Sequence, residues 1–117
     1  MRIPSLYIKP SPISGRGVFT AEDLPEGAAI EIAPVIVLSK ADKAAIHQTI
    51  LHDYYFNWGE DGRAAIALGY GGLYNHAADP NADYYMDFDG QTINFFARRD
   101  ISAGEEITID YGDRIWF

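Results

Sequence analysis

The sequence contains no cysteine, so disulfide bonds, thiolate metal sites and cysteine nucleophiles are excluded. A chain without cysteine is also compatible with a reducing compartment. Long hydrophobic runs are absent as well, since no apolar stretch approaches the roughly 20 residues that span a bilayer. The segment from Met1 to Ser5 lacks the basic start and apolar run of a signal peptide. We therefore expect a cytoplasmic or otherwise intracellular protein with no membrane partner.

Positive charge is scarce in this chain. Nine Lys and Arg residues face 17 Asp and Glu residues, which gives a formal net charge of -8. A surplus of negative charge disfavours contact with a phosphate backbone and attracts cationic partners. We expect no direct binding to nucleic acid and a basic protein or peptide as partner. Acidity that serves only solubility is the open alternative.

Apolar and aromatic residues are plentiful. The chain has 117 residues, of which 48% are hydrophobic and 14% are aromatic. This is the composition of a packed globular domain, and the length suits one hydrophobic core. No linker or low-complexity segment divides the chain, so we expect a single domain over residues 1–117.

Short β-rich runs separated by Gly and Pro predict strands along most of the chain. The predicted strands are Leu6–Lys9, Gly17–Thr20, Ala29–Ile32, Val35–Leu38 and Ala64–Leu68. One helix is expected from about Lys40 to Leu51, with Ser39 as its N-cap. The predicted fold class is therefore mostly β with one short helix.

Two local patterns refine this picture. Asp89-Gly90 lies between the strand-like runs Tyr84–Phe88 and Thr92–Phe96, which predicts a hairpin with a two-residue turn. The segments 19–32 and 96–109 repeat the pattern Phe-x3-Asp-(Leu/Ile)-x2-Gly-x2-Ile-x-Ile. This repetition indicates an all-β plan built from similar pieces, although similar turn chemistry alone can produce it.

Three groups of residues can carry chemistry. Gly15-Arg16-Gly17 allows close approach of backbone to a ligand, although a tight turn needs the same glycines. Asn75-His76 offers an amide and an imidazole group to a ligand. The alternative is that Asn75 is a capping residue and His76 is structural. A strand ends in Tyr111-Gly112, where the Tyr can also be ordinary packing. The glycine motifs of serine hydrolases, P-loop NTPases and dinucleotide-binding domains are missing.

A metal site is not expected from the histidines. His47 and His52 are five residues apart, and no second type of ligand accompanies His76. We therefore expect no metal cofactor.

Taken together and in this order, three motifs resemble those of the SET-domain protein lysine methyltransferases. They are Gly15-Arg16-Gly17-Val18-Phe19, Tyr74-Asn75-His76-x3-Pro80-Asn81 and Glu106-Ile107-Thr108-Ile109-Asp110-Tyr111-Gly112. The resemblance covers essentially the whole chain. It is closest to the minimal viral and bacterial SET proteins, which lack cysteine-rich zinc modules.

The resemblance implies a fold, a cofactor and a catalytic residue. The fold is the SET-domain β-clip of small curved sheets with a C-terminal pseudoknot, here with a central insert at about 39–64. S-adenosylmethionine is the methyl donor and S-adenosylhomocysteine the product. Tyr111 matches the catalytic tyrosine. The residues placed around the donor are Gly15, Arg16, Gly17, Asn75 and His76.

The chain departs from the family pattern at two places. Ala77-Ala78 replaces residues that often include Ser or Cys, and the sequence stops soon after Tyr111. Larger members close the site with a later aromatic segment. Here that role falls to Ile115, Trp116 and Phe117, or to a partner, and we assign Trp116 to cofactor binding.

The expected activity is methyl transfer to a lysine amine of a basic, histone-like protein, in the host nucleus if the chain is viral. Tyr84 is the first candidate to line the lysine channel, followed by Tyr54 and Tyr70, with packing as the alternative role. A non-catalytic β-clip module that binds a peptide or S-adenosylmethionine is the alternative function. We also expect a homodimer, formed through Tyr55, Phe56 and Trp58 or through residues 115–117.

Overall fold

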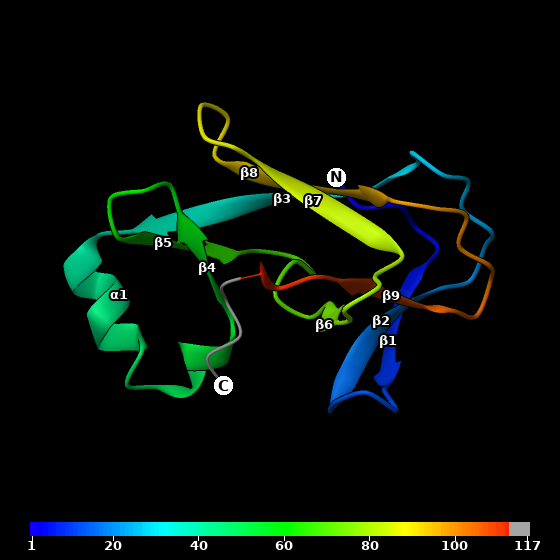
Figure 1. Ribbon diagram of the computed structural model, residues 1–117, viewed down its shortest axis with the longest axis horizontal. Helices are drawn as coiled ribbons and strands as arrows, with labels where there is room; N and C mark the ends of the chain where they lie inside the picture. The colour runs from blue at the N-terminus through cyan, green and yellow to red at the C-terminus, as the bar shows by residue number, and fades with distance from the viewer. Residues whose placement is uncertain (113–117) are drawn as a thin grey trace.

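The computed structural model describes residues 1–112 and folds them into two small curved sheets (Figure 1). This arrangement confirms the predicted mostly β fold with one short α-helix. In chain order the elements are β1 (Leu6–Pro10), β2 (Arg16–Thr20), β3 (Ala29–Leu38), α1 (Lys40–Ile46), the 3-10 helix η1 (Ile50–Asp53), β4 (Tyr55–Trp58), β5 (Arg63–Ala67), β6 (Asn75–His76), β7 (Ala82–Asp87), β8 (Thr92–Ala97) and β9 (Glu106–Ile109).

The four-stranded sheet has the order β1-β2-β9-β6. The late strand β9 lies between two earlier segments, antiparallel to β2 and parallel to β6. This is the strand arrangement that the predicted C-terminal pseudoknot requires. The parallel register sets Asn75 opposite Thr108 and His76 opposite Ile109, so the Asn-His pair lies beside the strand that leads to Tyr111.

The five-stranded sheet has the order β4-β5-β3-β8-β7. Its central strand β3 is continuous, whereas the sequence predicted two strands, Ala29–Ile32 and Val35–Leu38. Pro34 does not break β3 because it lies where the strand changes partner. It is the last residue paired with β8, and Val35 is the first paired with β5.

The helix is shorter than predicted. Ser39 caps it as expected, accepting a hydrogen bond from the Asp42 N–H at 3.1 Å, but α1 ends at Ile46 and not at Leu51. Thr49 is extended, and its hydroxyl accepts the Leu51 N–H, which begins the separate helix η1. A second cap therefore divides the segment that composition alone predicts to be one helix.

The hairpin of β7 and β8 is present, but its turn is longer than predicted. Asp87 pairs with Thr92, so residues 88–91 form the connection and not Asp89-Gly90 alone. The Asp87 carboxylate accepts the Gly90 N–H at 2.9 Å, and the positive φ of 53° falls on Gln91. This side-chain hydrogen bond stabilises a four-residue loop in place of the tight turn.

The two similar segments found in the sequence, 19–32 and 96–109, lie side by side and exchange equivalent hydrogen bonds. Leu24 and Ile101 each donate an N–H to the carbonyl of the other. The remaining reciprocal pairs join the Gly27 N–H to the Ala97 carbonyl, the Gly104 N–H to the Thr20 carbonyl, the Ala103 N–H to the Asp23 carboxylate and the Glu26 N–H to the Asp100 carboxylate. The repetition is thus an internal pseudo-twofold relation.

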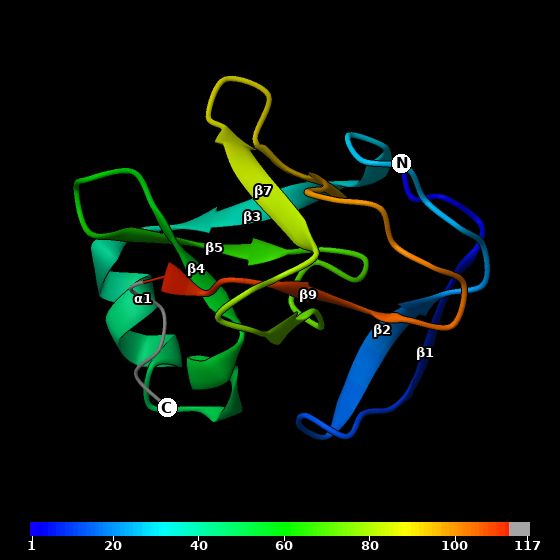
Figure 2. The same cartoon turned by 45° about the vertical axis from the view of Figure 1, so that its right-hand side comes forward.

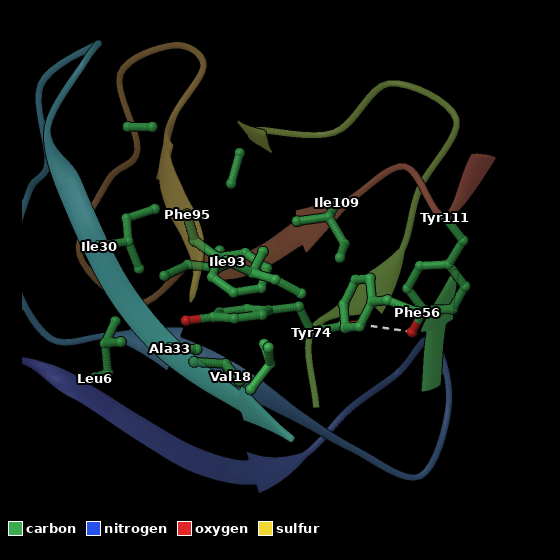
Figure 3. Close-up of a cluster of buried hydrophobic side chains, with 14 of the residues drawn as sticks. Leu6, Val18, Ile30, Ala33, Phe56, Tyr74, Ile93, Phe95, Ile109 and Tyr111 are labelled. Carbon is green, nitrogen blue, oxygen red and sulfur yellow. Dashed lines mark hydrogen bonds between the residues drawn. The ribbon is translucent and has the colours of Figure 1, made fainter. Parts of the chain in front are cut away.

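The hydrophobic core lies between the two sheets (Figure 3). Its largest fully buried side chains include Trp58, Tyr74, Phe56 and Phe95. Tyr55 is buried as well. The rings of Tyr55, Phe56 and Trp58 therefore pack within their own subunit and cannot form the exposed dimer patch that the sequence suggested.

The described residues form an elongated molecule with extents of 41 × 31 × 23 Å. In both views, α1 and η1 lie at one end and β1 and β2 at the other, with β9 between them (Figures 1 and 2). Within residues 1–112, no helix has the length and hydrophobicity needed to cross a membrane.

Candidate active site

A cleft of about 160 Å³ brings together segments that are far apart in the sequence. They are the turn before β2, the end of η1, the approach to β6, and Tyr111, which follows β9. The lining residues are Ser14, Gly15, Arg16, Asp53, Tyr54, Gly72, Leu73, Asn75 and Tyr111. Five residues that the sequence assigned to the site thus share one cleft.

The first wall of the cleft is the turn that precedes β2. Gly15 has a φ of 48°, a conformation that side chains other than glycine rarely adopt. Its carbonyl accepts the Ser11 N–H at 2.9 Å, which closes the turn. A side chain on Gly15 would meet no atom within 4 Å, so the glycine is required by the backbone alone.

Gly17 is needed for a different reason. It does not line the cleft, and a Cβ added there would collide with the Glu106 carboxylate and lie 3.0 Å from Asn75 Nδ2. The sequence suggested that this glycine lets a ligand approach the backbone. The space beside it is instead filled by Glu106 and Asn75.

Asn75 fastens the turn to the rest of the site. Its Nδ2 group donates to the Ser14 carbonyl at 3.1 Å, the Arg16 carbonyl at 3.3 Å and the Glu106 carboxylate at 2.8 Å. The amide hydrogens are therefore committed to the protein. Any ligand contact by this side chain falls to its carbonyl oxygen.

His76 lies directly against Tyr111. Its Nδ1 accepts the backbone N–H of Tyr111 at 3.0 Å, and the two ring centroids are 5.2 Å apart. The Asp110 carboxylate is 3.7 Å from the same nitrogen. Because Nδ1 accepts a hydrogen bond, the proton of the neutral ring is assigned to Nε2. His76 thus fixes where the chain turns after β9.

The Tyr111 hydroxyl donates to the backbone carbonyl of Tyr74 at 2.6 Å (Figure 3). Only 9% of Tyr111 is exposed, so this hydrogen bond lies at the inner end of the cleft. With its hydrogen committed to the protein, the oxygen of Tyr111 presents lone pairs and acts as an acceptor.

Tyr74 is itself held by a buried carboxylate. Its hydroxyl donates to Glu31 Oε1 at 2.8 Å, and Glu31 is only 2% exposed. The second oxygen of Glu31 accepts the Tyr70 N–H at 3.0 Å. Burial, and then the negative charge of Glu31, raise the pKa of Tyr74 far above its ordinary value.

The predicted lysine-channel tyrosines lie in different places. Tyr54 lines the cleft with Tyr111. Tyr84 is partly buried against the core, with its ring centroid 5.5 Å from that of Phe56, and does not line the cleft. Tyr70 also lies outside the cleft, where the Arg2 guanidinium stacks 3.8 Å above its ring. Trp116 lies outside the described residues.

The sequence assigned no role at the site to four residues of this region, although two of them, Tyr74 and Glu106, lie within the quoted motifs. Tyr74 supplies a backbone carbonyl, which any residue type can do. Glu31 and Glu106 look like ordinary strand carboxylates, and their role depends on partners distant in the sequence. Asp53 belongs to none of the three motifs, yet it lines the cleft.

Within residues 1–112, no group of three or more His, Asp or Glu side chains is arranged to hold a metal ion. His52 Nδ1 lies 2.8 Å from the Asp53 carboxylate, and the rings of His47 and His52 meet edge to face with centroids 4.3 Å apart. The histidines are therefore joined to neighbouring side chains.

The fold is similar to that of a known histone lysine methyltransferase. A family model described as SET domain matches residues 15–112, and the chain belongs to the SET domain family. The H3 lysine-37 specific histone-lysine N-methyltransferase of Schizosaccharomyces pombe is 38% identical over 122 residues, which cover 100% of this chain and 82% of that protein.

Two solved structures are similar as well. The crystal structure of a candidate histone methyltransferase of Plasmodium falciparum has a TM-score of 0.69 and 30% identity, covering 92% of this chain and 96% of that one. The Neurospora SET domain protein DIM-5, a histone lysine methyltransferase, has a TM-score of 0.72 at 18% identity, covering 91% of this chain and 51% of that one, and supports the fold alone. The predicted enzyme class, SET-type protein-lysine methyltransferase, is confirmed.

Proposed function

We propose that the cleft binds the methyl donor S-adenosylmethionine and that Tyr111 is the catalytic residue for methyl transfer to a lysine amine. The observation that carries this proposal is the Tyr111 hydroxyl at the inner end of the cleft, held by the Tyr74 carbonyl at 2.6 Å. SET methyltransferases use this donor, so the cofactor class follows from the family.

The cleft residues fit the chemistry of such a donor. Its amino-acid end carries one carboxylate and one ammonium group, and the cleft offers one cation, Arg16, and one anion, Asp53. Gly15 and Asn75 contribute backbone groups and an amide oxygen beside them. His76 does not itself line the cleft, but it packs against Tyr111 and presents a partly exposed ring suited to stacking on adenine.

When bound, S-adenosylmethionine supplies an electrophilic methyl group on a sulfonium and leaves as S-adenosylhomocysteine. The oxygen of Tyr111 accepts a hydrogen bond from the substrate amine and so turns the nitrogen lone pair toward the methyl group. The amine must be neutral to react, although the ordinary pKa of lysine is about 10.4. Burial of the amine against the rings of Tyr54 and Tyr111 would lower that pKa and favour the neutral form.

The proposed substrate is a basic, histone-like protein. The net charge of -8 favours a cationic partner, and a relative that is 38% identical over the whole chain acts on histone H3. Tyr54 on the cleft rim and Tyr84 beside Phe56 are the proposed walls of the lysine channel. The packing of Tyr70 against Arg2 makes it the weakest of the three candidates.

The test is transfer of a radiolabelled methyl group to a panel of basic proteins, with mass spectrometry of the products. We expect Tyr111→Phe to lower turnover at least about 100-fold, because the hydroxyl orients the substrate amine and accepts its hydrogen bond at the reacting centre. S-adenosylhomocysteine affinity, measured by calorimetry, should change by less than about threefold, because phenylalanine keeps an aromatic ring at this position.

Three outcomes decide between the alternatives. Activity of Tyr111→Phe within a few-fold of the native chain would remove Tyr111 from the mechanism. A native chain that binds S-adenosylhomocysteine but methylates no protein would be a non-catalytic binding module. A native chain that does not bind it would refute the assignment of the cleft.

A further inference from the structure

Glu106 is a carboxylate that the proposed mechanism does not use. It is the first residue of β9, and it does not line the cleft. Both of its oxygens nevertheless accept hydrogen bonds from segments that build the cleft. The Ser11 hydroxyl donates to Oε1 at 2.7 Å, and the Asn75 amide donates to Oε2 at 2.8 Å.

The first of these hydrogen bonds anchors the beginning of the loop over residues 11–17. Ser11 also donates its N–H to the Gly15 carbonyl at 2.9 Å, and its hydroxyl accepts the Ile13 N–H at 3.0 Å. The Ser11 side chain is thus both an internal brace of the loop and its attachment to Glu106.

The second hydrogen bond anchors the end of the same loop through Asn75. While Glu106 holds the Asn75 amide, that amide donates to the carbonyls of Ser14 and Arg16. Glu106 therefore fixes both ends of the segment that carries Ser14, Gly15 and Arg16 to the cleft. The close approach of Gly17 to the Glu106 carboxylate completes this attachment.

Hydrogen bonds to a charged acceptor are stronger than those between neutral groups, so two of them on one carboxylate hold a loop firmly. A loop that already has its binding geometry loses less conformational entropy when a ligand binds. Removing the carboxylate should therefore weaken binding and leave the chemistry of the bound complex intact.

We propose that Glu106 is a positioning residue that preorganises the 11–17 loop for the methyl donor. The proposal rests on the function proposed above for the cleft. It separates two roles within the C-terminal motif: Tyr111 acts on the reaction, and Glu106 acts on donor affinity through Ser11 and Asn75.

The first test measures S-adenosylhomocysteine affinity by calorimetry for the full chain. We expect Glu106→Ala to weaken binding about tenfold or more, and Glu106→Gln to fall between it and the native chain, since the amide keeps one acceptor. Turnover at saturating donor should stay within about threefold, so the change appears in KM and not in kcat.

Glu105→Gln is the matched control. Glu105 is the neighbouring carboxylate, and it accepts the Ser102 N–H at 3.1 Å, outside the cleft. This variant should retain native affinity and native turnover.

The second test reads the loop without any ligand. We expect the N–H groups of Ser11 and Ile13 to exchange with solvent about tenfold faster in Glu106→Ala than in the native chain. If Glu106→Ala does not fold, as judged by circular dichroism, Glu106→Gln serves for both measurements and Ser11→Ala for the affinity measurement alone.

The outcomes separate this proposal from the function on which it rests. A native chain that fails to bind S-adenosylhomocysteine refutes the proposed function. A native chain that binds it, together with Glu106 variants of unchanged affinity and unchanged exchange, refutes the positioning role alone. A lower melting temperature with unchanged affinity of the folded protein would make Glu106 a stabilising residue only, and would likewise overturn the proposal.

Discussion

A buried carboxylate organises the inner end of the cleft. Glu31 lies within the core, where an unpaired charge is costly, and it is compensated by the Tyr74 hydroxyl and the Tyr70 N–H. Tyr74 links this pair to the cleft because its carbonyl accepts the hydroxyl of Tyr111. The position of the Tyr111 hydroxyl, the proposed catalytic group, therefore depends on Tyr74. The Tyr74 side chain is held by Glu31, which accepts hydrogen bonds from both Tyr74 and Tyr70.

The buried hydroxyl of Tyr74 should make stability sensitive to alkaline pH. Its pKa in the folded chain is raised from the ordinary value of 10.0 by burial and by Glu31. The unfolded chain releases this proton near pH 10, whereas the folded chain retains it. Below about pH 9 there is no effect, and above about pH 10 the stability falls by up to about 1.4 kcal/mol per pH unit.

Tyr74→Phe should remove this contribution, so the free energy of unfolding, measured in urea, should fall less steeply between about pH 10 and about pH 11. Tyr85→Phe is the control, because 58% of Tyr85 is exposed and its loss should leave the slope unchanged. Equal alkaline slopes for the native chain and Tyr74→Phe would contradict the expectation.

The site residues that the sequence identified share one property, which is a local signal. Gly15 lies in a glycine-containing turn, Asn75 in a polar pair after an apolar run, and Tyr111 at the end of a strand. Glu31 has no such signal, and Glu106 lies within the C-terminal motif without any sign of its role, because the donors that compensate both carboxylates come from other elements. A carboxylate becomes a buried acceptor only when distant segments assemble around it.

At the scale of elements, the internal repetition was the most informative feature of the sequence. It correctly indicated similar pieces, and the structure adds that the two pieces bond to each other through reciprocal contacts. The errors in element boundaries arose from single side chains. Thr49 ends α1 early, Asp87 lengthens the hairpin loop, and Pro34 marks a change of partner within one strand.

The pseudo-twofold relation predicts matched effects at its two glycines. Gly27 and Gly104 have φ values of 85° and 89°, and a Cβ at either position would meet no atom within 4 Å. Substitution by alanine therefore adds backbone strain alone. Gly27→Ala and Gly104→Ala should each lower the free energy of unfolding by about 1–2 kcal/mol, and by similar amounts.

Chemical denaturation measures both losses, and Gly72→Ala provides the comparison. Gly72 does not have a positive φ, and a Cβ there would make ordinary contacts, the nearest at 3.6 Å from the Tyr54 carbonyl. Its substitution should change stability by less than about 1 kcal/mol. A large loss at only one of the two related glycines would show that the repetition does not extend to energetics.

At the scale of the whole molecule, the site exists only when the two ends of the chain have come together. The cleft joins a turn near the N-terminus, the helical end of the molecule, and Tyr111, which follows β9. Contacts between segments so distant in sequence form late and at a cost in entropy. This dependence explains why fold class and motif residues are predictable from sequence while the network around them is not.

A second copy of the chain would need an exposed apolar surface to cover. The outer face of the five-stranded sheet carries Ile32 of β3 and Tyr85 of β7, which are 37% and 58% exposed. Both pair with Asn94 of β8, so they flank one strand, and they line a groove of about 400 Å³ with Phe96. Ile36 continues the apolar row along β3.

We expect a homodimer in which this face packs against its own copy around a twofold axis, since stacked sheet faces bury such rows of side chains. Light scattering at micromolar concentration should give twice the 13.0 kDa mass of one chain. Ile32→Asp should give the monomer mass, because a carboxylate at the centre of an apolar interface is not compensated. Ile50→Asp, at an isoleucine of η1 that is even more exposed, should leave the dimer intact. A native chain of monomer mass with full methyl transfer activity would show that this sheet face needs no cover and that one subunit completes the site.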